Sequence, residues 1–199
     1  QLLVLALPRG GVPMAYEVAI ALDAPLDVFP VRKLGVPHQP ELAFGALAPG
    51  GTRVLNPEIV QALRLSDETM DAVAKREIEE LERQQAQYRG ERAPPEVAGK
   101  AVIVVDDGLA TGATMRAAVG ALRAQDAKRV IVAVPTASRE AVELLKREAD
   151  RVVAGIVPAD FAAVGAWYGV FPQTSDSEVK DLLDRANRAY AGNHEKAHP

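Results

Sequence analysis

The sequence predicts an α/β protein with a parallel-sheet core and helices on both faces of the sheet. Two observations support this fold class: apolar runs typical of buried strands alternate with amphipathic helical segments, and the strongest run, 101–105, ends in two acidic residues. Such alternation is typical of right-handed crossovers between parallel strands, which place ligands at the carboxyl ends of the strands. The length of 199 residues favours a single domain, expected over 1–190.

The first part of the predicted core is a strand, a helix and a second strand. Residues 3–7 form a continuous apolar run that predicts a strand buried on both faces. Pro13 can stand in the first turn of the helix that follows residues 9–11. Residues 26–31 predict the second strand, and Pro30 within it favours a position at the edge of the sheet.

A long segment and a long helix then interrupt the alternation. Residues 32–52 contain seven Gly and Pro residues and no regular apolar pattern, so we expect a loop that is partly mobile. Ser66 can cap a helix whose first turn is acidic and whose apolar stripe runs to Leu81. This helix belongs to an insert over about 57–97 and is expected on the domain surface, with a contact in a homodimer as the alternative.

The second half of the chain returns to alternating strands and helices. Three apolar runs predict strands, at 101–105, 130–134 and 152–157. Ser138 can cap a helix between the last two strands, and Ser175 with Glu178 forms a capping box for the final helix. Residues 191–199 are expected to form a flexible tail.

Composition and charge exclude several classes of function. The net charge of -4 argues against broad electrostatic binding to nucleic acid or to an anionic membrane. The absence of cysteine excludes disulfides, catalytic thiols and cysteine-ligated zinc, and it fits a cytoplasmic location. No apolar run reaches the roughly 18 residues of a membrane helix. The apolar start has no basic segment typical of a signal peptide, and it begins almost inside a strand, so we expect an upstream segment.

Common catalytic and cofactor motifs are absent or unconvincing. There is no G-x-G spacing of a dinucleotide site, no P-loop and no G-x-S-x-G nucleophile turn. Residues 194–198 match H-E-x-x-H, but a zinc site needs this motif on a buried helix together with a third ligand. Because the motif lies at the end of the chain, we interpret it as part of a solvated tail.

The residues that carry chemistry lie between the strand 101–105 and the next helix. Asp106 and Asp107 end the strand, where they suit the hydroxyl groups of a sugar and a cationic transition state. The loop that follows has only small side chains: Ala110, Thr111, Gly112, Ala113 and Thr114. Its backbone N–H groups, at a helix N-terminus, can converge on a phosphate group, and the threonines add hydroxyl donors.

This segment resembles the signature of the type I phosphoribosyltransferase family: four apolar residues, an acidic pair, two apolar residues and a small T-G-x-T-like loop. Gly108 stands where the family usually has an aliphatic residue. The resemblance extends from Leu2 to about Tyr190 and is strongest to a poorly characterised bacterial branch. It implies a type I phosphoribosyltransferase-like core with a small hood, expected here from about 32–55 and 158–175.

The resemblance implies a Mg²⁺-dependent pentosyltransferase. It would transfer the 5-phosphoribosyl group of phosphoribosyl pyrophosphate to a nitrogen acceptor, such as a nucleobase or related small molecule, and release pyrophosphate. Asp106 and Asp107 would hold the ribose hydroxyls and the metal, directly or through substrate or water, and residues 110–114 would bind the 5-phosphate. The pyrophosphate loop, where the family often has a non-proline cis peptide bond, would consist of Arg9, Gly10 and Gly11.

The resemblance also implies roles for two further segments. Lys33, with Arg32 as the second candidate, would add a cation to the pyrophosphate from a loop that closes over the substrate. Trp167 or Tyr168 would stack on the acceptor base, with packing beneath the hood as the alternative.

Two other functions compete with this interpretation. A regulatory protein could bind phosphoribosyl pyrophosphate or a nucleotide without turnover, and a hydrolase or phosphatase could use the acidic pair with a metal. The phosphate loop directly after the acidic pair argues against the hydrolase.

Overall fold

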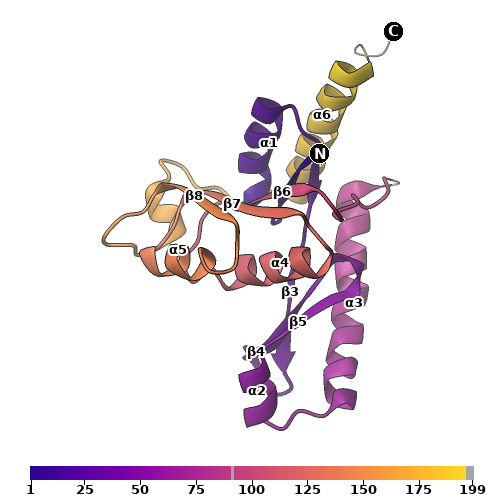
Figure 1. Ribbon diagram of the computed structural model, residues 1–199, viewed down its shortest axis with the longest axis vertical. Helices are drawn as coiled ribbons and strands as arrows, with labels where there is room; N and C mark the ends of the chain where they lie inside the picture. The colour runs from indigo at the N-terminus through magenta and orange to yellow at the C-terminus, as the bar shows by residue number, and fades with distance from the viewer. Residues whose placement is uncertain (91, 196–199) are drawn as a thin grey trace.

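The computed structural model describes residues 1–90 and 92–195, which form a five-stranded and a three-stranded sheet (Figure 1). The larger sheet is parallel throughout, with strand order β2-β1-β6-β7-β8. Its strands are β1 (Leu2–Ala6), β2 (Leu26–Val28), β6 (Ala101–Val105), β7 (Arg129–Thr136) and β8 (Arg151–Ile156). The predicted fold class is therefore confirmed, and β2 lies at the edge of the sheet as Pro30 indicated.

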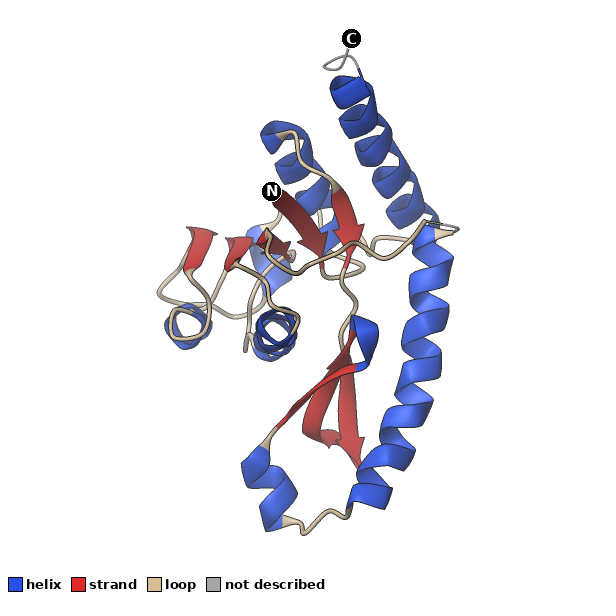
Figure 2. Cartoon of the chain, turned by 45° about the vertical axis from the view of Figure 1, so that its right-hand side comes forward, coloured by secondary structure: helices blue, strands red, loops and turns tan. Residues whose placement is uncertain are grey.

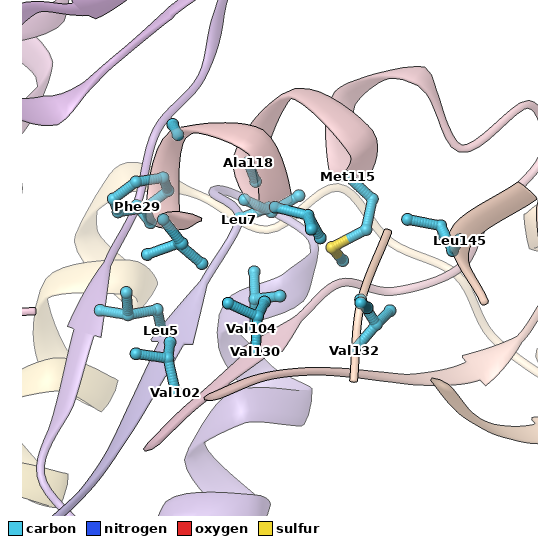
Figure 3. Packing of buried hydrophobic residues seen from close by; sticks show 14 of the residues in the cluster. Leu5, Leu7, Phe29, Val102, Val104, Met115, Ala118, Val130, Val132 and Leu145 are labelled. Carbon is cyan, nitrogen blue, oxygen red and sulfur yellow. The ribbon is translucent and has the colours of Figure 1, made fainter. Parts of the chain in front are cut away.

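Helices cover both faces of the larger sheet. They are α1 (Gly11–Leu22) and α6 (Asp176–Glu195) on one face and α4 (Ala113–Ala124) and α5 (Arg139–Leu145) on the other. Because side chains alternate along a strand, Val102 and Val104 of β6 pack in the core beneath α4, whereas Ile103 and Val105 pack with α1 and α6. Figure 3 shows Met115 of α4 lying over the face that carries Val102 and Val104.

The segment 32–52 forms a small antiparallel sheet, so the prediction of a long loop is wrong. Its strands, in the order β3-β4-β5, are β3 (Arg32–Val36), β4 (Gln39–Ala48) and β5 (Thr52–Leu55), with a short 3₁₀ helix, Pro49–Gly51, before β5. Leu34 and Phe44 are fully buried between this sheet and the insert. The small sheet extends away from the larger one, as Figure 2 shows.

The glycines of this segment serve close strand packing and a turn, although in the sequence they are also typical of a loop. A Cβ atom on Gly45 in β4 would stand 2.6 Å from the carbonyl oxygen of Val54 in β5. Gly50 and Gly51 have positive φ angles of 77° and 72° and form the turn into β5. These residues are required for close strand approach and for a tight turn.

The insert forms α2 (Pro57–Ala62) and α3 (Asp67–Arg89), and α3 connects the two sheets. Ser66 caps α3 as predicted, because its side chain accepts a hydrogen bond from the N–H of Thr69. Val73 and Leu81 pack against the small sheet, whereas Tyr88 lies in the core with α1 and α6. The helix therefore does more than cover a surface: it runs along one side of both sheets (Figure 2).

Arg89 joins the end of α3 to the edge strand β2 through a buried ion pair. Its Nε donates to both carboxylate oxygens of Asp27, at 2.8 and 2.9 Å, and its Nη2 donates to the carbonyl oxygen of Val28 at 3.0 Å. The side chains of Arg89 and Asp27 are only 4% and 14% exposed.

Removing Arg89 should therefore be costly. Arg89→Ala leaves the Asp27 carboxylate buried without its partner, so we expect a loss of about 3–5 kcal/mol in the free energy of unfolding, measured with urea. Arg83→Ala is the matched control, because Arg83 pairs with Glu80 on the exposed side of the same helix. It should change stability little, and an equal loss in the two variants would contradict the role of the buried pair.

The final helix is capped by Ser175, which is one half of the predicted capping box, and it is longer than predicted. Ser175 Oγ accepts a hydrogen bond from the N–H of Glu178 at 3.2 Å. Residues 191–195 are helical, so the predicted tail is wrong there, because contacts with Asp23 hold the last turn: Asn193 donates to its carboxylate at 2.9 Å and His194 lies 3.9 Å from it. The rest of the tail and of the H-E-x-x-H match, 196–199, lies outside the described residues.

Within 1–90 and 92–195, no helix combines the length and apolar character needed to cross a membrane.

Candidate functional site

Two loops meet at the carboxyl edge of the larger sheet. β1 pairs with β6 so that Ala6 stands opposite Val105, and the segments after these residues leave the sheet side by side. A Cβ atom on Gly10 would overlap Oδ2 of Asp107, and one on Gly11 would lie 2.6 Å from the carbonyl oxygen of Val105. Only glycine permits this approach. The peptide bond between Pro8 and Arg9 is cis.

The acidic pair lies partly buried directly after β6. Asp106 Oδ1 accepts a hydrogen bond from the N–H of Asp107 at 2.9 Å. Burial, and then the negative charge of Asp107, raises the pKa of Asp106 to about 7. Burial also raises the pKa of Asp107. Raised pKa values in adjacent carboxyl groups indicate negative charge that a cation or a hydroxyl-bearing ligand would stabilise.

The raised pKa of Asp106 makes stability depend on pH. Its carboxyl group titrates near 7 in the folded chain, against a usual value of 3.8 for an unfolded chain. Between these values only the folded state keeps the proton, so the free energy of unfolding falls as pH rises through this range.

Asp106→Asn should abolish this dependence. We expect the variant to exceed the wild type at pH 8 by on the order of 2 kcal/mol in the free energy of unfolding, with little difference at pH 4. Urea unfolding at the two pH values measures the effect. An equal gain at both pH values would contradict the role of ionisation.

The predicted phosphate loop is held in shape by β7 and by the start of α5. Leu109 N–H donates to the carbonyl oxygen of Thr136 at 3.0 Å, and Ser138 N–H donates to the carbonyl oxygen of Leu109 at 2.8 Å. Ser138 Oγ donates to the carbonyl oxygen of Ala110 at 2.6 Å. Gly112 precedes α4 with a positive φ of 72°. These contacts give the small-residue loop a defined path into the helix.

The exposed side of this loop is polar. Thr111, Ala113 and Thr114 are exposed; Thr111 stands just before α4, and the other two lie in its first turn. Thr111 Oγ1 accepts a long hydrogen bond from the N–H of Ala113, at 3.4 Å. A helix N-terminus with two nearby hydroxyl groups is an arrangement that can bind a phosphate group.

Gly108, the departure from the family signature, lets a distant segment pack over the acidic loop. A Cβ atom on Gly108 would lie 2.6 Å from Cγ1 of Val164 and 3.1 Å from Cγ2 of Thr136. Val164 begins the 3₁₀ helix Val164–Trp167, and Tyr168, the next residue, donates its hydroxyl to the carbonyl oxygen of Asp107. Burial and the two nearby acids raise the pKa of Tyr168 to about 12, so the phenol keeps the proton it donates.

The close approach at Gly108 gives a stability prediction. Gly108→Ala should destabilise the protein by about 1–3 kcal/mol, because the new methyl group meets Val164. For a chain of this length that corresponds to a loss of several degrees in Tm, measured by thermal unfolding. Adding Val164→Ala should recover part of the loss, with Val164→Ala alone as the control. Simple addition of the two single effects would show that Val164 is not the obstacle.

A cavity of about 460 Å³ lies beside the two loops. Its lining consists of Arg9, Gly10, Asp107, Phe171, Pro172, Gln173 and Thr174. The aromatic side chain in this lining is Phe171, and neither Trp167 nor Tyr168 lines the cavity. The ring centre of Phe171 lies 4.7 Å from that of Tyr168. Phe171 lies close to Trp167 and Tyr168 in the sequence, but residues 168–174 form no helix or strand, so no periodic pattern could single it out.

Arg32 and Lys33, the two cations at the start of the small sheet, do not line this cavity. Arg32 Nε is 2.8 Å from Oε2 of Glu77 on α3 and forms an ion pair with it. Lys33 lines a second cavity of about 780 Å³, between the small sheet and α4, together with Ala113 and Thr114. Lys33 is thus placed on the side of the predicted phosphate loop, and Arg32 lines neither cavity.

The chain is similar to a family model, to a mycobacterial protein and to a solved structure. Residues 46–166 match the family model described as a phosphoribosyl transferase domain. A Mycobacterium tuberculosis protein, named provisionally as a phosphoribosyl transferase, is 50% identical over 188 residues, which are 94% of this chain and 42% of that protein. This chain therefore spans less than half the length of that relative. The crystal structure of TT1426 from Thermus thermophilus superimposes with a TM-score of 0.80 at 47% identity, over 91% of this chain and 86% of that one.

Proposed function

The chain belongs to the phosphoribosyltransferase family, and from this premise we propose that it transfers the 5-phosphoribosyl group of phosphoribosyl pyrophosphate to a nitrogen acceptor. The acceptor would be a nucleobase or a related small molecule, and pyrophosphate would be released. One observation carries the proposal: the acidic pair after β6 lies against the glycine loop after β1, with the phosphate loop beginning three residues further on. This arrangement supports the proposal because groups that would suit the pyrophosphate, the ribose and the 5-phosphate lie at one end of the sheet.

In this mechanism the chain positions the reactants and stabilises charge, and no covalent intermediate with the protein is needed. Residues 110–114 bind the 5-phosphate through N–H and hydroxyl groups. Asp106 and Asp107 accept hydrogen bonds from the ribose 2- and 3-hydroxyls, and their charge favours an oxocarbenium-like transition state at C1. Arg9 and the N–H of Gly10 bind the pyrophosphate as it leaves.

The remaining residues are proposed to act at the two ends of the substrate. Lys33 would supply a cation from the small sheet at the phosphate end, since it lines a cavity with Thr114. Arg32 is a weaker candidate because Glu77 already pairs with it. The acceptor would be held by the aromatic segment of Trp167, Tyr168 and Phe171.

The acidic pair fits a Mg²⁺ ion shared with the substrate. Mg²⁺ is commonly held by one or two carboxylates together with substrate oxygens and water. No group of three or more His, Cys, Asp or Glu side chains that could hold a metal is found among the described residues, so the substrate would supply further ligands. When bound, the ion would neutralise charge on the pyrophosphate and improve it as a leaving group.

The test is acceptor-dependent release of pyrophosphate from phosphoribosyl pyrophosphate and Mg²⁺, measured with a panel of nucleobases and related nitrogen nucleophiles. A transferase releases pyrophosphate only with its acceptor. Calorimetric binding without release would support the regulatory alternative, and release without any acceptor would support a hydrolase. The proposal would be overturned if the protein neither bound phosphoribosyl pyrophosphate nor released pyrophosphate from it.

A further inference from the structure

We propose that Asp176 is a positioning residue that holds Arg9 at the cavity beside the acidic pair, and that the end of α3 fixes Asp176 in place. The inference rests on the proposed function and deepens it. It gives the helical insert a part in the site, although α3 contributes no residue to the lining of the smaller cavity.

Three side chains converge on the Asp176 carboxylate. The Tyr88 hydroxyl donates to Oδ1 at 2.8 Å, the Gln87 amide donates to Oδ2 at 2.9 Å, and Arg9 Nη1 lies 3.6 Å from Oδ1. Tyr88 is only 2% exposed and packs in the core, so its hydroxyl is a rigid donor. The hydrogen bond from Tyr88 is the main cause that holds the pKa of Asp176 below its usual range, so this contact favours the carboxylate form that pairs with Arg9.

The contact restrains Arg9 without occupying all of its guanidinium group. A single nitrogen approaches Asp176, at a distance longer than in a bidentate pair, and the described part of the chain offers this guanidinium no hydrogen bond. Arg9 also lines the cavity with Gly10 and Asp107. Its other N–H groups are therefore left for an anion in that cavity.

Positioning and simple charge neutralisation predict opposite effects on anion binding. An arginine that binds a ligand loses rotamer freedom, and a side chain that is already restrained loses less. Removing the restraint should then weaken binding. If Asp176 were only a counter-ion competing for Arg9, removing its negative charge should strengthen binding of an anion.

The experiment compares Asp176→Asn with Glu178→Gln in calorimetric binding of pyrophosphate with Mg²⁺. Each substitution removes one negative charge from the first turn of α6. Glu178 is exposed, and it is the matched control because Arg9 pairs with Asp176 and not with it. We expect Asp176→Asn to raise the Kd about three- to tenfold and Glu178→Gln to leave it within about twofold.

Tyr88→Phe tests the link to α3 and serves also if Asp176→Asn does not fold. It keeps the ring and every charge and removes the hydroxyl that donates to Asp176, so we expect a rise in Kd of about two- to fivefold. With a responsive acceptor, both variants should raise the KM for phosphoribosyl pyrophosphate and leave kcat within about twofold, since Arg9 binds the substrate before and during reaction. A loss confined to kcat would contradict positioning.

An Arg9→Ala background decides whether Asp176 acts through Arg9. There, Asp176→Asn should have no further effect on pyrophosphate affinity. An equal loss in both backgrounds, or tighter binding by Asp176→Asn, overturns the positioning role. If the wild type binds pyrophosphate and Asp176→Asn behaves like Glu178→Gln, only this role fails. If the wild type binds neither pyrophosphate nor phosphoribosyl pyrophosphate, the proposed function fails with it.

Discussion

Replacing both acids, Asp106→Asn with Asp107→Asn, is expected to abolish phosphoribosyl transfer while the fold is retained. The strand that carries them, β6, is anchored by buried apolar residues, and the acids lie beyond its end. Removing a single preorganised group that stabilises transition-state charge typically costs about 100- to 1,000-fold in rate, so the pair should cost at least about 1,000-fold in kcat/KM. The measurement is pyrophosphate release with a responsive acceptor.

A charge-matched control separates this effect from a change in net charge. Asp181→Asn with Asp184→Asn removes the same two charges from α6, where both residues form exposed ion pairs with arginines. This control should keep turnover within about twofold of the wild type. Wild-type turnover in the Asp106 and Asp107 variant would show that the acidic pair is structural.

Gly10→Ala is expected to lower kcat/KM by about 100-fold or more through the addition of one methyl group. The backbone of Gly10 has a φ of -59°, which any residue can adopt, so the effect comes from contact and not from backbone strain. The new Cβ atom would overlap Oδ2 of Asp107 and displace either the carboxyl group or the glycine loop. A misplacement of about 1 Å at a reacting centre is enough for a loss of this size.

Gly192→Ala is the control for Gly10→Ala, because a Cβ atom on Gly192 meets nothing within 4 Å. It should leave activity unchanged. Thermal unfolding of Gly10→Ala distinguishes a local displacement, with a small change in Tm, from loss of the fold. Normal activity in Gly10→Ala would show that the contact between the glycine loop and Asp107 is not part of the site.

The sequence by itself determined the parallel core and the end of the sheet at which the acidic pair and the predicted phosphate loop lie. Both follow from local order: the apolar run of β6, two acids, a small-residue loop and then a helix. Because parallel strands expose their carboxyl ends at one edge, the glycine loop after β1 could be placed near the acids without coordinates. Gly108 could not be explained, since its neighbour Val164 is distant in the chain.

Only the tertiary structure decided which side chains line the two cavities and which pair elsewhere. The small sheet could not be predicted because its glycines are also typical of loops. Gly45 allows two strands to approach closely, and Gly50 and Gly51 form a turn. Arg32 forms an ion pair with Glu77 on α3, and Tyr88 donates a hydrogen bond to Asp176, which lies 88 positions further along the chain. Contacts between residues so far apart leave no periodic or local pattern, because they depend on how completed helices and sheets pack together.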